Sequence, residues 1–226
     1  MKSRIQRKAK KTSTKEKSKK SRGIFLTFEG GEGVGKTTQI AKLAHAFEAA
    51  GHRVVVTREP GGTKIANRIR SLLLDPEMKG LIPLAELLLY EASRAQHVAE
   101  VIKPALAAGK VVICDRFADS SLVYQGAARG VAGALVKQLN EVATGGLKPK
   151  LTFIFDLDPR IGLARVGARG ILDRVEKEAL SFHKAVRRGY LNLVKSDPRR
   201  CRRIDASQSR DAIHEQLLEE LAAWLR

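Results

Sequence analysis

Short apolar runs alternate along the chain with longer stretches in which apolar residues recur every three or four positions. The runs are typical of buried strands and fall at residues 24–28, 53–57, 111–114 and 151–156, and a short, more polar segment at 201–205 is interpreted as a fifth strand. The longer stretches predict helices at residues 37–50, 64–74, 84–107, 175–194 and 209–225. Strands that alternate with helices predict an α/β fold in three layers, with a five-stranded parallel sheet and helices on both of its faces.

The length of 226 residues is enough for one substantial domain or at most two small ones, and the sequence shows no internal repeat. We expect a single domain over residues 23–226. The longest helical pattern, 84–107, contains Pro104, and we expect the helix to kink near that residue.

Charge separates an N-terminal tail from this domain. Residues 1–22 hold eleven Lys or Arg against one acidic residue, Glu16, which accounts for +10 of the net charge of +18. Such a segment has almost nothing to bury, so we expect a basic disordered tail. We favour a solubilising leader, and the alternatives are targeting or weak non-specific contact with nucleic acid. The remaining +8 suits a protein that gathers cations around several phosphates.

Several features indicate where the protein works. No stretch approaches the roughly 20 apolar residues that a membrane span needs, and the N-terminus lacks the apolar segment of a signal peptide. The two cysteines, Cys114 and Cys201, have no metal-ligand spacing. We therefore expect a cytoplasmic protein with reduced thiols and no membrane partner.

A glycine-rich stretch between the first strand and the first helix matches the phosphate-binding pattern G-x-x-x-x-G-K-[ST]. Backbone N–H groups of such a turn, together with the helix N-terminus, can bind a polyphosphate. Lys36 would reach the β- and γ-phosphates, and the Thr37 hydroxyl would ligate Mg²⁺. The alternative, an ordinary glycine turn, fits the full pattern poorly. We expect a P-loop NTPase fold that binds a nucleoside triphosphate through Gly30, Gly31, Glu32, Gly33, Val34, Gly35, Lys36, Thr37 and Thr38.

Charged pairs follow two other predicted strands. Arg58 and Glu59 come directly after the second strand, and Asp115 and Arg116 close the third. Because parallel strands end at one edge of a sheet, we expect these side chains to meet the P-loop there. Arginines would suit a second phosphate-bearing ligand, and a carboxylate beside the P-loop would suit Mg²⁺. Each pair taken alone could instead be a surface ion pair.

The helical pattern 84–107 carries a polar stripe of Glu86, Tyr90 and Arg94, with His97 close to the same line. Periodicity alone slightly favours an exposed polar face. The alternative is the wall of a nucleobase pocket, in which an aromatic ring stacks on the base and an arginine supplies directed hydrogen bonds.

An arginine-rich segment follows the fourth strand. Residues 163–174 contain Arg165, Arg169 and Arg174 among glycines. A solvated loop would be an ordinary interpretation. Given the P-loop, we favour a short mobile lid that closes over the phosphates and brings arginines to the developing charge.

Taken together, these motifs resemble those of the thymidylate kinase family over nearly the whole chain from residue 23 onward. The motifs that carry the resemblance are FEGGEGVGKTT at 28–38, TREPGGT at 57–63, LLLYEASR at 87–94, DRF at 115–117, YQG at 124–126 and RGILDR at 169–174. The resemblance implies a phosphotransferase that uses Mg²⁺ and ATP to convert dTMP to dTDP, for dTTP synthesis. It also implies a homodimer, and the apolar face of the 84–107 helix is a reasonable contact surface.

The resemblance assigns roles in the acceptor site. Glu32 matches the acidic residue that approaches the sugar 3′-hydroxyl. Arg58 and Arg116 match the arginines that hold the monophosphate. Further residues match those around the sugar and base: Tyr90 stacks on thymine, Arg94 reaches the base edge, and Ser121, Tyr124 and Gln125 line the sugar and base and disfavour a ribose 2′-hydroxyl.

Further roles concern the metal and the transition state. Thr37 is the expected metal ligand, with Asp115 and Glu59 as outer supports. Some family members place an arginine directly after the acidic P-loop residue, where this chain has Gly33. Lid arginines would then supply the cation, although Gly167 stands where some relatives have a basic residue. The expected catalytic residues are Lys36, Arg116, Arg165 and Arg169.

Two other functions remain open from the sequence. One is a kinase for another nucleoside monophosphate, against which Tyr90, Arg94 and Gln125 argue. The other is a non-catalytic P-loop binding module, which the intact Lys36 and Thr37 make less suitable.

Overall fold

A computed structural model describes residues 23–168, 170–223 and 225. The predicted tail, residues 1–22, lies outside the described residues. The strands β1 (Ile24–Gly30), β2 (Val54–Arg58), β3 (Val111–Asp115), β4 (Leu151–Asp156) and β5 (Cys201–Asp205) form one parallel sheet in the order β2-β3-β1-β4-β5. All five predicted strands are confirmed, including the short fifth one.

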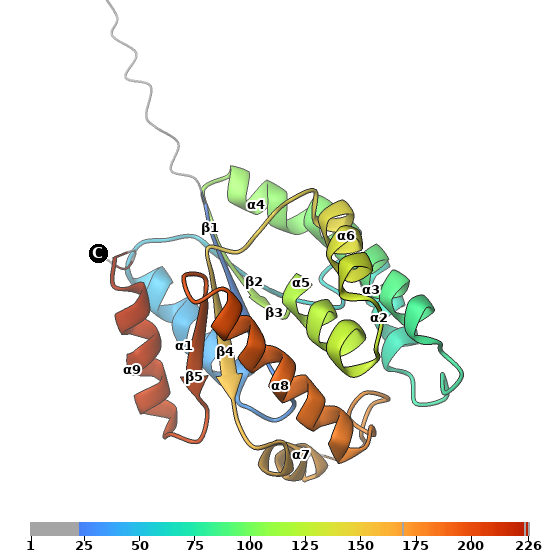
Figure 1. The fold of residues 1–226 in the computed structure, drawn as a ribbon. Helices are drawn as coiled ribbons and strands as arrows, with labels where there is room; N and C mark the ends of the chain where they lie inside the picture. Colours follow the sequence, from blue (N-terminus) through green and yellow to red (C-terminus); the bar gives the residue numbers. More distant parts are fainter. Residues whose placement is uncertain (1–22, 169, 224, 226) are drawn as a thin grey trace, which may run out of the picture.

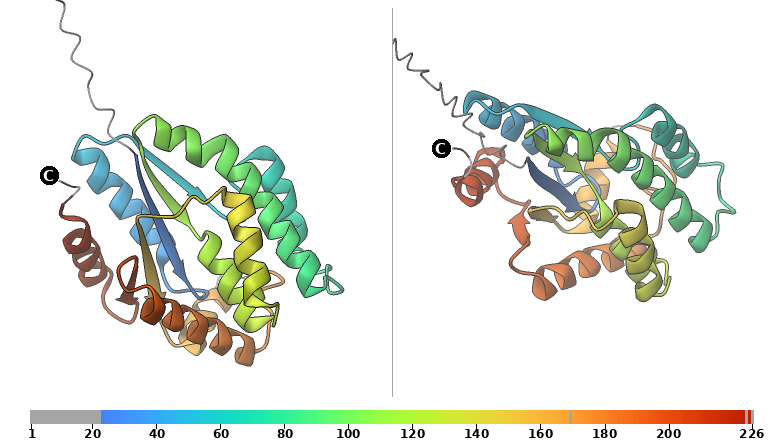
Figure 2. Two further views of the ribbon diagram at one scale, coloured as in Figure 1. Left: turned by 45° about the horizontal axis from the view of Figure 1, so that its top comes forward. Right: turned by 90° about the horizontal axis from the view of Figure 1, so that it is seen from above.

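Helices cover both faces of the sheet (Figures 1 and 2). On one face lie α1 (Lys36–Ala49) and α9 (Arg210–Leu221), which contact each other and the strands. On the other face lie α4 (Lys103–Ala107) and α8 (Leu180–Ser196). Outside this second layer, α3 (Pro83–His97) packs against both α2 (Lys64–Leu74) and α6 (Gly133–Thr144). The expected three-layer α/β fold is confirmed.

The alternation of side chains along each strand explains why separate hydrophobic clusters lie on the two faces of the sheet. In β1, Leu26 and Phe28 point toward α1 and α9, where they pack with Phe153 and Phe155 of β4. Phe25, which points to the other face, packs in a separate cluster that includes residues of β3 and of the helical layer behind it. The central strands β1, β3 and β4 are mainly apolar on both faces because helices cover both, which is why they appear in the sequence as apolar runs.

The long helical pattern 84–107 is interrupted rather than simply kinked. α3 passes into a π-helical turn, η1 (Val98–Ile102), before α4 begins. Pro104 lies in the first turn of α4 and cannot donate a backbone hydrogen bond, which fits a change in the helical ladder directly before it. The helix expected at 175–194 begins later, at Leu180, and the helix expected at 209–225 ends at Leu221.

A helix that the sequence did not predict follows β4. α7 (Pro159–Gly167) begins after Asp158, whose side chain accepts a hydrogen bond from the Arg160 N–H, and it has proline in its first turn. The first part of the expected lid, including Arg165, is therefore helical. Two further short elements, α5 (Ala118–Ser121) and the π-helical η2 (Leu122–Ala128), follow β3.

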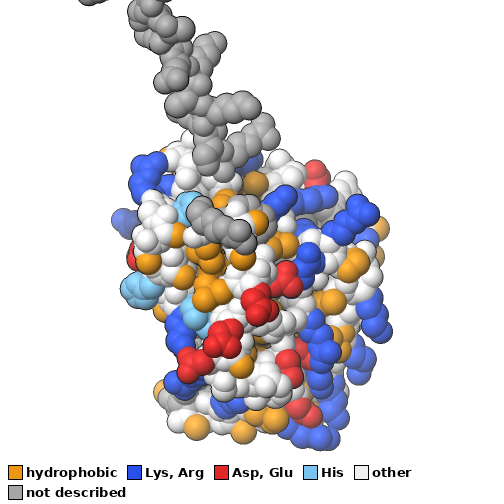
Figure 3. All heavy atoms as spheres, turned by 90° about the vertical axis from the view of Figure 1, so that its left-hand side faces the viewer, with side chains coloured by type: hydrophobic (Ala, Val, Ile, Leu, Met, Phe, Trp, Pro, Cys, Tyr) orange, Lys and Arg blue, Asp and Glu red, His pale blue; other side chains and the backbone are white. Residues whose placement is uncertain are grey.

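The outer surface carries the basic charge that the sequence predicts for the domain. Figure 3 views the face that carries α9 and shows Lys and Arg side chains gathered along the right-hand border of that view. Within the described part of the chain, no helix combines the length and apolar character needed to span a membrane.

Candidate active site

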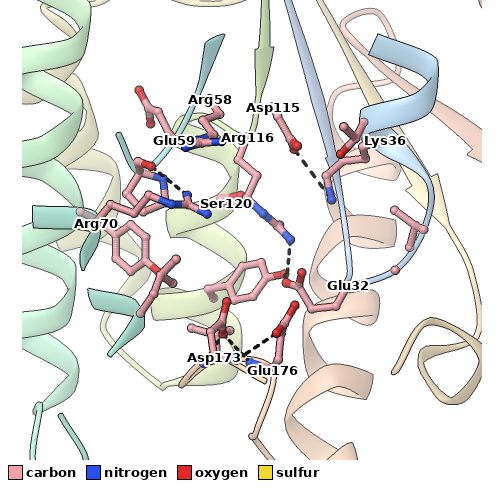
Figure 4. Close-up of a pocket in the computed structure, with 18 of the residues that line it drawn as sticks. Glu32, Lys36, Arg58, Glu59, Arg70, Asp115, Arg116, Ser120, Asp173 and Glu176 are labelled. Carbon is pink, nitrogen blue, oxygen red and sulfur yellow. Dashed lines mark hydrogen bonds and ion pairs between the residues drawn. The ribbon is translucent and has the colours of Figure 1, made fainter. Parts of the chain in front are cut away.

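A cavity of about 390 Å³ lies at the edge where the carboxyl ends of β1, β2 and β3 meet. Asp115, the last residue of β3, is in register with Arg58, the last residue of β2, and with Phe28 of β1, which continues to Gly30. Figure 4 shows the side chains of Lys36, Arg58 and Arg116 around this cavity. The P-loop and the two charged pairs therefore lie together at this edge, as expected.

The P-loop connects β1 to α1 through backbone conformations that favour glycine. Gly33 and Gly35 have φ angles of 65° and 89°, and Gly35 precedes the first residue of α1. Lys36 is buried, its Nζ donates to the Gly31 carbonyl at 3.2 Å, and it lies 3.9 Å from an Asp115 carboxylate oxygen. Burial and then the Arg116 guanidinium lower the pKa of Lys36, while Asp115 acts in the opposite direction.

The residues present fit a magnesium ion held together with phosphates. The buried Asp115 Oδ1 accepts no hydrogen bond from the described residues, although it faces Lys36. Thr37 lines the same cavity. Mg²⁺ usually binds through one or two carboxylates plus substrate phosphates. No group of three or more His, Cys, Asp or Glu side chains in the described ranges could hold a metal ion.

Glu59, the third residue expected near the metal, has other partners. Its two carboxylate oxygens accept hydrogen bonds from Arg94 Nε at 2.8 Å and pair with His97 Nδ1 at 3.0 Å. Glu59 is buried and lines the cavity. This geometry makes Glu59 a support of the cavity wall, and its proposed contribution to the metal site stays a prediction.

Glu32 and Arg116 join the P-loop to the end of β3. Arg116 donates from Nη2 to Glu32 Oε1 at 2.6 Å and from Nη1 to the Gly30 carbonyl at 2.8 Å. Tyr124 donates its hydroxyl to the same Glu32 oxygen at 2.9 Å. Burial alone would raise the pKa of Glu32, but Arg116 and Lys36 hold it below its usual value. Burial opposes the charge of Arg116 as well, yet Glu32 raises the pKa of Arg116 well above its usual value.

The opposite wall of the cavity contains Arg58, Tyr90 and Gln125, as expected, and also Arg70, which sequence reasoning missed. Arg70 lies on α2 and donates to the Pro60 carbonyl at 2.9 Å. Burial and the nearby Arg58 lower the pKa of Arg70, so two guanidinium groups stand close together here. In the sequence Arg70 occupies an ordinary polar position of an amphipathic helix. Only the three-dimensional structure, which places it beside Arg58, identifies it as a site residue.

Arg94 and Ser121 lie behind this wall. Arg94 is 1% exposed, and its guanidinium donates to Glu59, Glu91, Ser121, Asn140 and the Phe117 carbonyl. The exposed polar face that periodicity slightly favoured for this helix is wrong, because Glu86, Arg94 and His97 are all buried. The expected contact of Arg94 with a base stays a prediction, and in this structure Arg94 holds together the elements behind the cavity.

Glu29 is a second residue that sequence reasoning missed. It is fully buried at the end of β1 and accepts hydrogen bonds from the Phe117 N–H, the Ser120 hydroxyl and the Tyr190 hydroxyl, at 2.6–2.7 Å. Burial and then Asp119 raise the pKa of Glu29 to about 7. Ser120 lines the cavity, so this carboxyl group fixes part of the wall from behind.

The segment expected to form the lid contributes side chains to the cavity and to the packing beside it. Arg165 on α7 lines the cavity and lies with Nη1 3.4 Å from the Gly33 carbonyl. Arg174 is buried, donates to the Leu73 carbonyl at 2.8 Å and lies 2.6 Å from Glu86. Asp173 and Glu176 border the cavity below Glu32 in Figure 4. Arg169 lies outside the described residues.

Comparison with known proteins assigns this arrangement to a family. The family model for thymidylate kinase matches residues 28–217, which include the P-loop, both charged pairs and the lid. The chain belongs to the thymidylate kinase family. The resemblance based on the motifs is thereby confirmed, and the P-loop fold agrees with it.

Individual thymidylate kinases match over most of their length. That of Deinococcus radiodurans is 51% identical over 197 residues, covering 87% of this chain and 95% of the relative. That of Geobacter sulfurreducens is 52% identical over 196 residues, covering 84% and 92%. The crystal structure of thymidylate kinase from Ehrlichia chaffeensis superposes with a TM-score of 0.72 at 36% identity, covering 88% of this chain and 98% of that one.

Proposed function

We propose that the protein is a dTMP kinase, which transfers the γ-phosphoryl group of ATP to dTMP and yields dTDP and ADP. The observation that carries this proposal is that the P-loop and the arginines Arg58, Arg70 and Arg116 line the same cavity. One polyphosphate site and one monophosphate site sharing a cavity is the arrangement that phosphoryl transfer between nucleotides requires. The names of the relatives supply the identity of the acceptor.

The donor side follows from the P-loop. Residues Gly30–Thr38 would surround the β- and γ-phosphates with backbone N–H groups, and Lys36 would exchange its bond to the Gly31 carbonyl for one to phosphate. Thr37 and Asp115 would hold the Mg²⁺ ion that the family uses, which when bound would neutralise negative charge on the phosphates.

The acceptor phosphate would lie between the arginines. A dTMP phosphate oxygen is already an anion, so it can attack the γ-phosphorus in line without a general base while the bond to the β,γ-bridging oxygen of ATP breaks. Arg58, Arg70 and Arg116 would hold this nucleophile and offset repulsion between the two phosphates. Catalysis is then positioning together with charge neutralisation.

Sugar and base would occupy the rest of the cavity. The ionised Glu32 carboxylate, held by Arg116 and Tyr124, is suited to accept a hydrogen bond from the sugar 3′-hydroxyl. The ring of Tyr90 would stack on thymine, and Gln125 would meet the base edge. Burial and then Glu86 raise the pKa of Tyr90, which keeps the phenol neutral.

The transition-state cation would come from the lid. Arg165 is already beside the P-loop, since its Nη1 lies 3.4 Å from the Gly33 carbonyl. Lys36 and Arg116 act from the other sides of the transferred group. Arg169 remains the second candidate, on the resemblance alone.

A coupled assay of ADP release with dTMP, dUMP, dGMP, CMP and AMP as acceptors tests the proposal. Turnover confined to dTMP and close analogues supports it. A kinase for another nucleoside monophosphate would prefer a different acceptor, and a non-catalytic module would show no turnover with any of them. Either of those results would refute the proposal.

A homodimer is also proposed. The side chains of Leu84 and Leu88 on α3 are 45% and 49% exposed, and Ile65 and Leu72 on the adjacent α2 are exposed too. Such neighbouring apolar side chains are typical of a surface that another molecule covers. Light scattering on the purified protein should give twice the mass of the chain, and a monomer at micromolar concentration would contradict this. The cytoplasmic location and weak nucleic-acid contact by the tail stay predictions.

A further inference from the structure

Gln125 is held from behind by a carboxylate. It belongs to η2, is 2% exposed and lines the cavity. Its Nε2 donates to Oε1 of Glu86 at 2.8 Å. Glu86, on α3, is equally buried and lies behind Gln125 as seen from the cavity.

Two arginines hold Glu86 in place. Arg129 donates to both of its carboxylate oxygens at 3.3 Å, and Arg174 Nη2 lies 2.6 Å from Oε2. Arg129 is in turn paired with Glu178 at 2.7 Å. A buried carboxylate that faces two guanidinium groups accepts hydrogen bonds and has none to donate. Glu86 is therefore a fixed acceptor at a defined position.

A fixed acceptor decides which way an amide points. The oxygen and nitrogen ends of a glutamine amide have nearly the same shape, so an amide without such a partner can present either end to a ligand. Glu86 accepts a hydrogen bond from the nitrogen end of the Gln125 amide. The reverse orientation would place the amide oxygen against a carboxylate oxygen, and both are acceptors. The carbonyl oxygen and the second N–H of Gln125 are then what remains for a ligand in the cavity.

We propose that Glu86 determines base selectivity by fixing the Gln125 amide in the orientation that complements thymine and uracil and opposes cytosine. This inference rests on the proposed function, in which the base lies beside Tyr90 and Gln125. Thymine and uracil present an N3–H donor next to the O4 acceptor, which match the Gln125 carbonyl and N–H. Cytosine presents an N3 acceptor next to an amino donor, and it would need the amide turned around.

The variant Glu86→Gln tests the proposal because it keeps the shape of the side chain but can itself present a donor or an acceptor. The amide of Gln125 would then be free to turn. Steady-state kinetics with dTMP, dUMP and dCMP should show the ratio of kcat/KM for dTMP over dCMP falling by about tenfold or more. The ratio for dTMP over dUMP should stay unchanged, because both bases carry the N3–H. The loss for dTMP should appear mainly in KM.

Two further variants complete the test. Glu178→Gln disturbs the same buried ion-pair cluster but leaves the Glu86–Gln125 bond in place, and it should keep the wild-type dTMP over dCMP ratio. Gln125→Leu removes the amide while Glu86 keeps both arginines, so this variant tests the same point if Glu86→Gln does not fold. It should lower the dTMP over dCMP ratio to a similar extent.

Several results would overturn the inference. Equal proportional losses of kcat/KM for all three substrates in Glu86→Gln would indicate a purely structural role. An unchanged ratio of kcat/KM for dTMP over dCMP in Gln125→Leu would show that the amide does not select the base. Loss of that ratio in Glu178→Gln would assign the selectivity to the charge cluster instead. The proposed function fails separately, if the wild-type protein does not phosphorylate dTMP.

Discussion

The backbone of Gly162 in α7 lies directly against the carbonyl oxygen of Glu32 in the P-loop. A β-carbon at residue 162 would lie 2.2 Å from that oxygen, and a β-carbon at Gly33 would lie 2.2 Å from the carbonyl oxygen of Gly162. Both sides of this contact are backbone, so neither can yield by turning a side chain. The backbone of α7, the helix that carries Arg165, therefore packs directly against the loop proposed to hold the transferred phosphate.

Replacing Gly162 by alanine should lower kcat by roughly tenfold or more, because α7 must move away from the P-loop and take Arg165 with it. Overpacking of this kind should also cost about 1–3 kcal/mol of unfolding free energy. Gly167→Ala is a matched control in the same helix, since a β-carbon there meets no atom within 4 Å. Steady-state kinetics and urea unfolding of both variants check this, and equal kcat values would contradict the packing of α7 against the P-loop.

Glu29 should make folding stability depend on pH. Its pKa is about 7 in the folded protein against an ordinary 4.5, so between these values the folded state binds more protons. Stability from this group is therefore present below about pH 4.5 and is lost as the pH rises to about 7. The unfolding free energy of the wild type relative to Glu29→Gln should fall by up to about 3 kcal/mol over this range. A difference that does not vary with pH would show that Glu29 titrates normally.

Arg165→Ala and Arg169→Ala separate the two lid candidates. The variant that removes the transition-state cation should lose roughly 10³-fold or more in kcat with little change in dTMP affinity. Arg160→Ala is the control, because Arg160 is exposed in the first turn of the same helix as Arg165. Weaker dTMP binding with unchanged kcat would reassign the residue to the acceptor site.

Tyr90→Ala should weaken dTMP binding by roughly 1–3 kcal/mol, the range for a base stacked on an aromatic ring. Tyr90→Phe keeps the ring and should bind dTMP nearly as well as the wild type. Isothermal titration gives both dissociation constants. If dTMP bound equally well to the alanine variant, the base would have to lie elsewhere in the cavity.

The central strands β1, β3 and β4 were predictable because they are buried on both faces and therefore appear as apolar runs. The edge strand β5, with sequence CRRID, has only Cys201 and Ile204 buried and carries a weaker signal. The proximity of the P-loop to the pairs at residues 58–59 and 115–116 was predictable because parallel strands end at one edge of a sheet. α7 was missed because its glycines and arginines suggested a loop, although Asp158 and Pro159 are ordinary signals for the start of a helix.

Buried polar residues could not be predicted in the same way. Glu29 stands alone in an apolar strand, and its three donors come from segments about 90 or more residues away. Glu86 and Arg94 form a polar stripe that looks exposed until their partners on other elements are known. Periodicity records where polar residues occur but carries no information about pairing across the fold, and pairing is what allows these side chains to be buried.

The central claim is that one turn of chain, Gly30–Thr38, joins a donor phosphate site to an acceptor site. The most direct measurement follows the phosphoryl group itself, using ATP labelled with ¹⁸O in its γ-phosphate, dTMP and Mg²⁺, with mass spectrometry of the products. We expect the label in the terminal phosphate of dTDP. Release of ADP with the label only in inorganic phosphate would contradict the claim, because it would show an ATPase whose P-loop has no acceptor beside it.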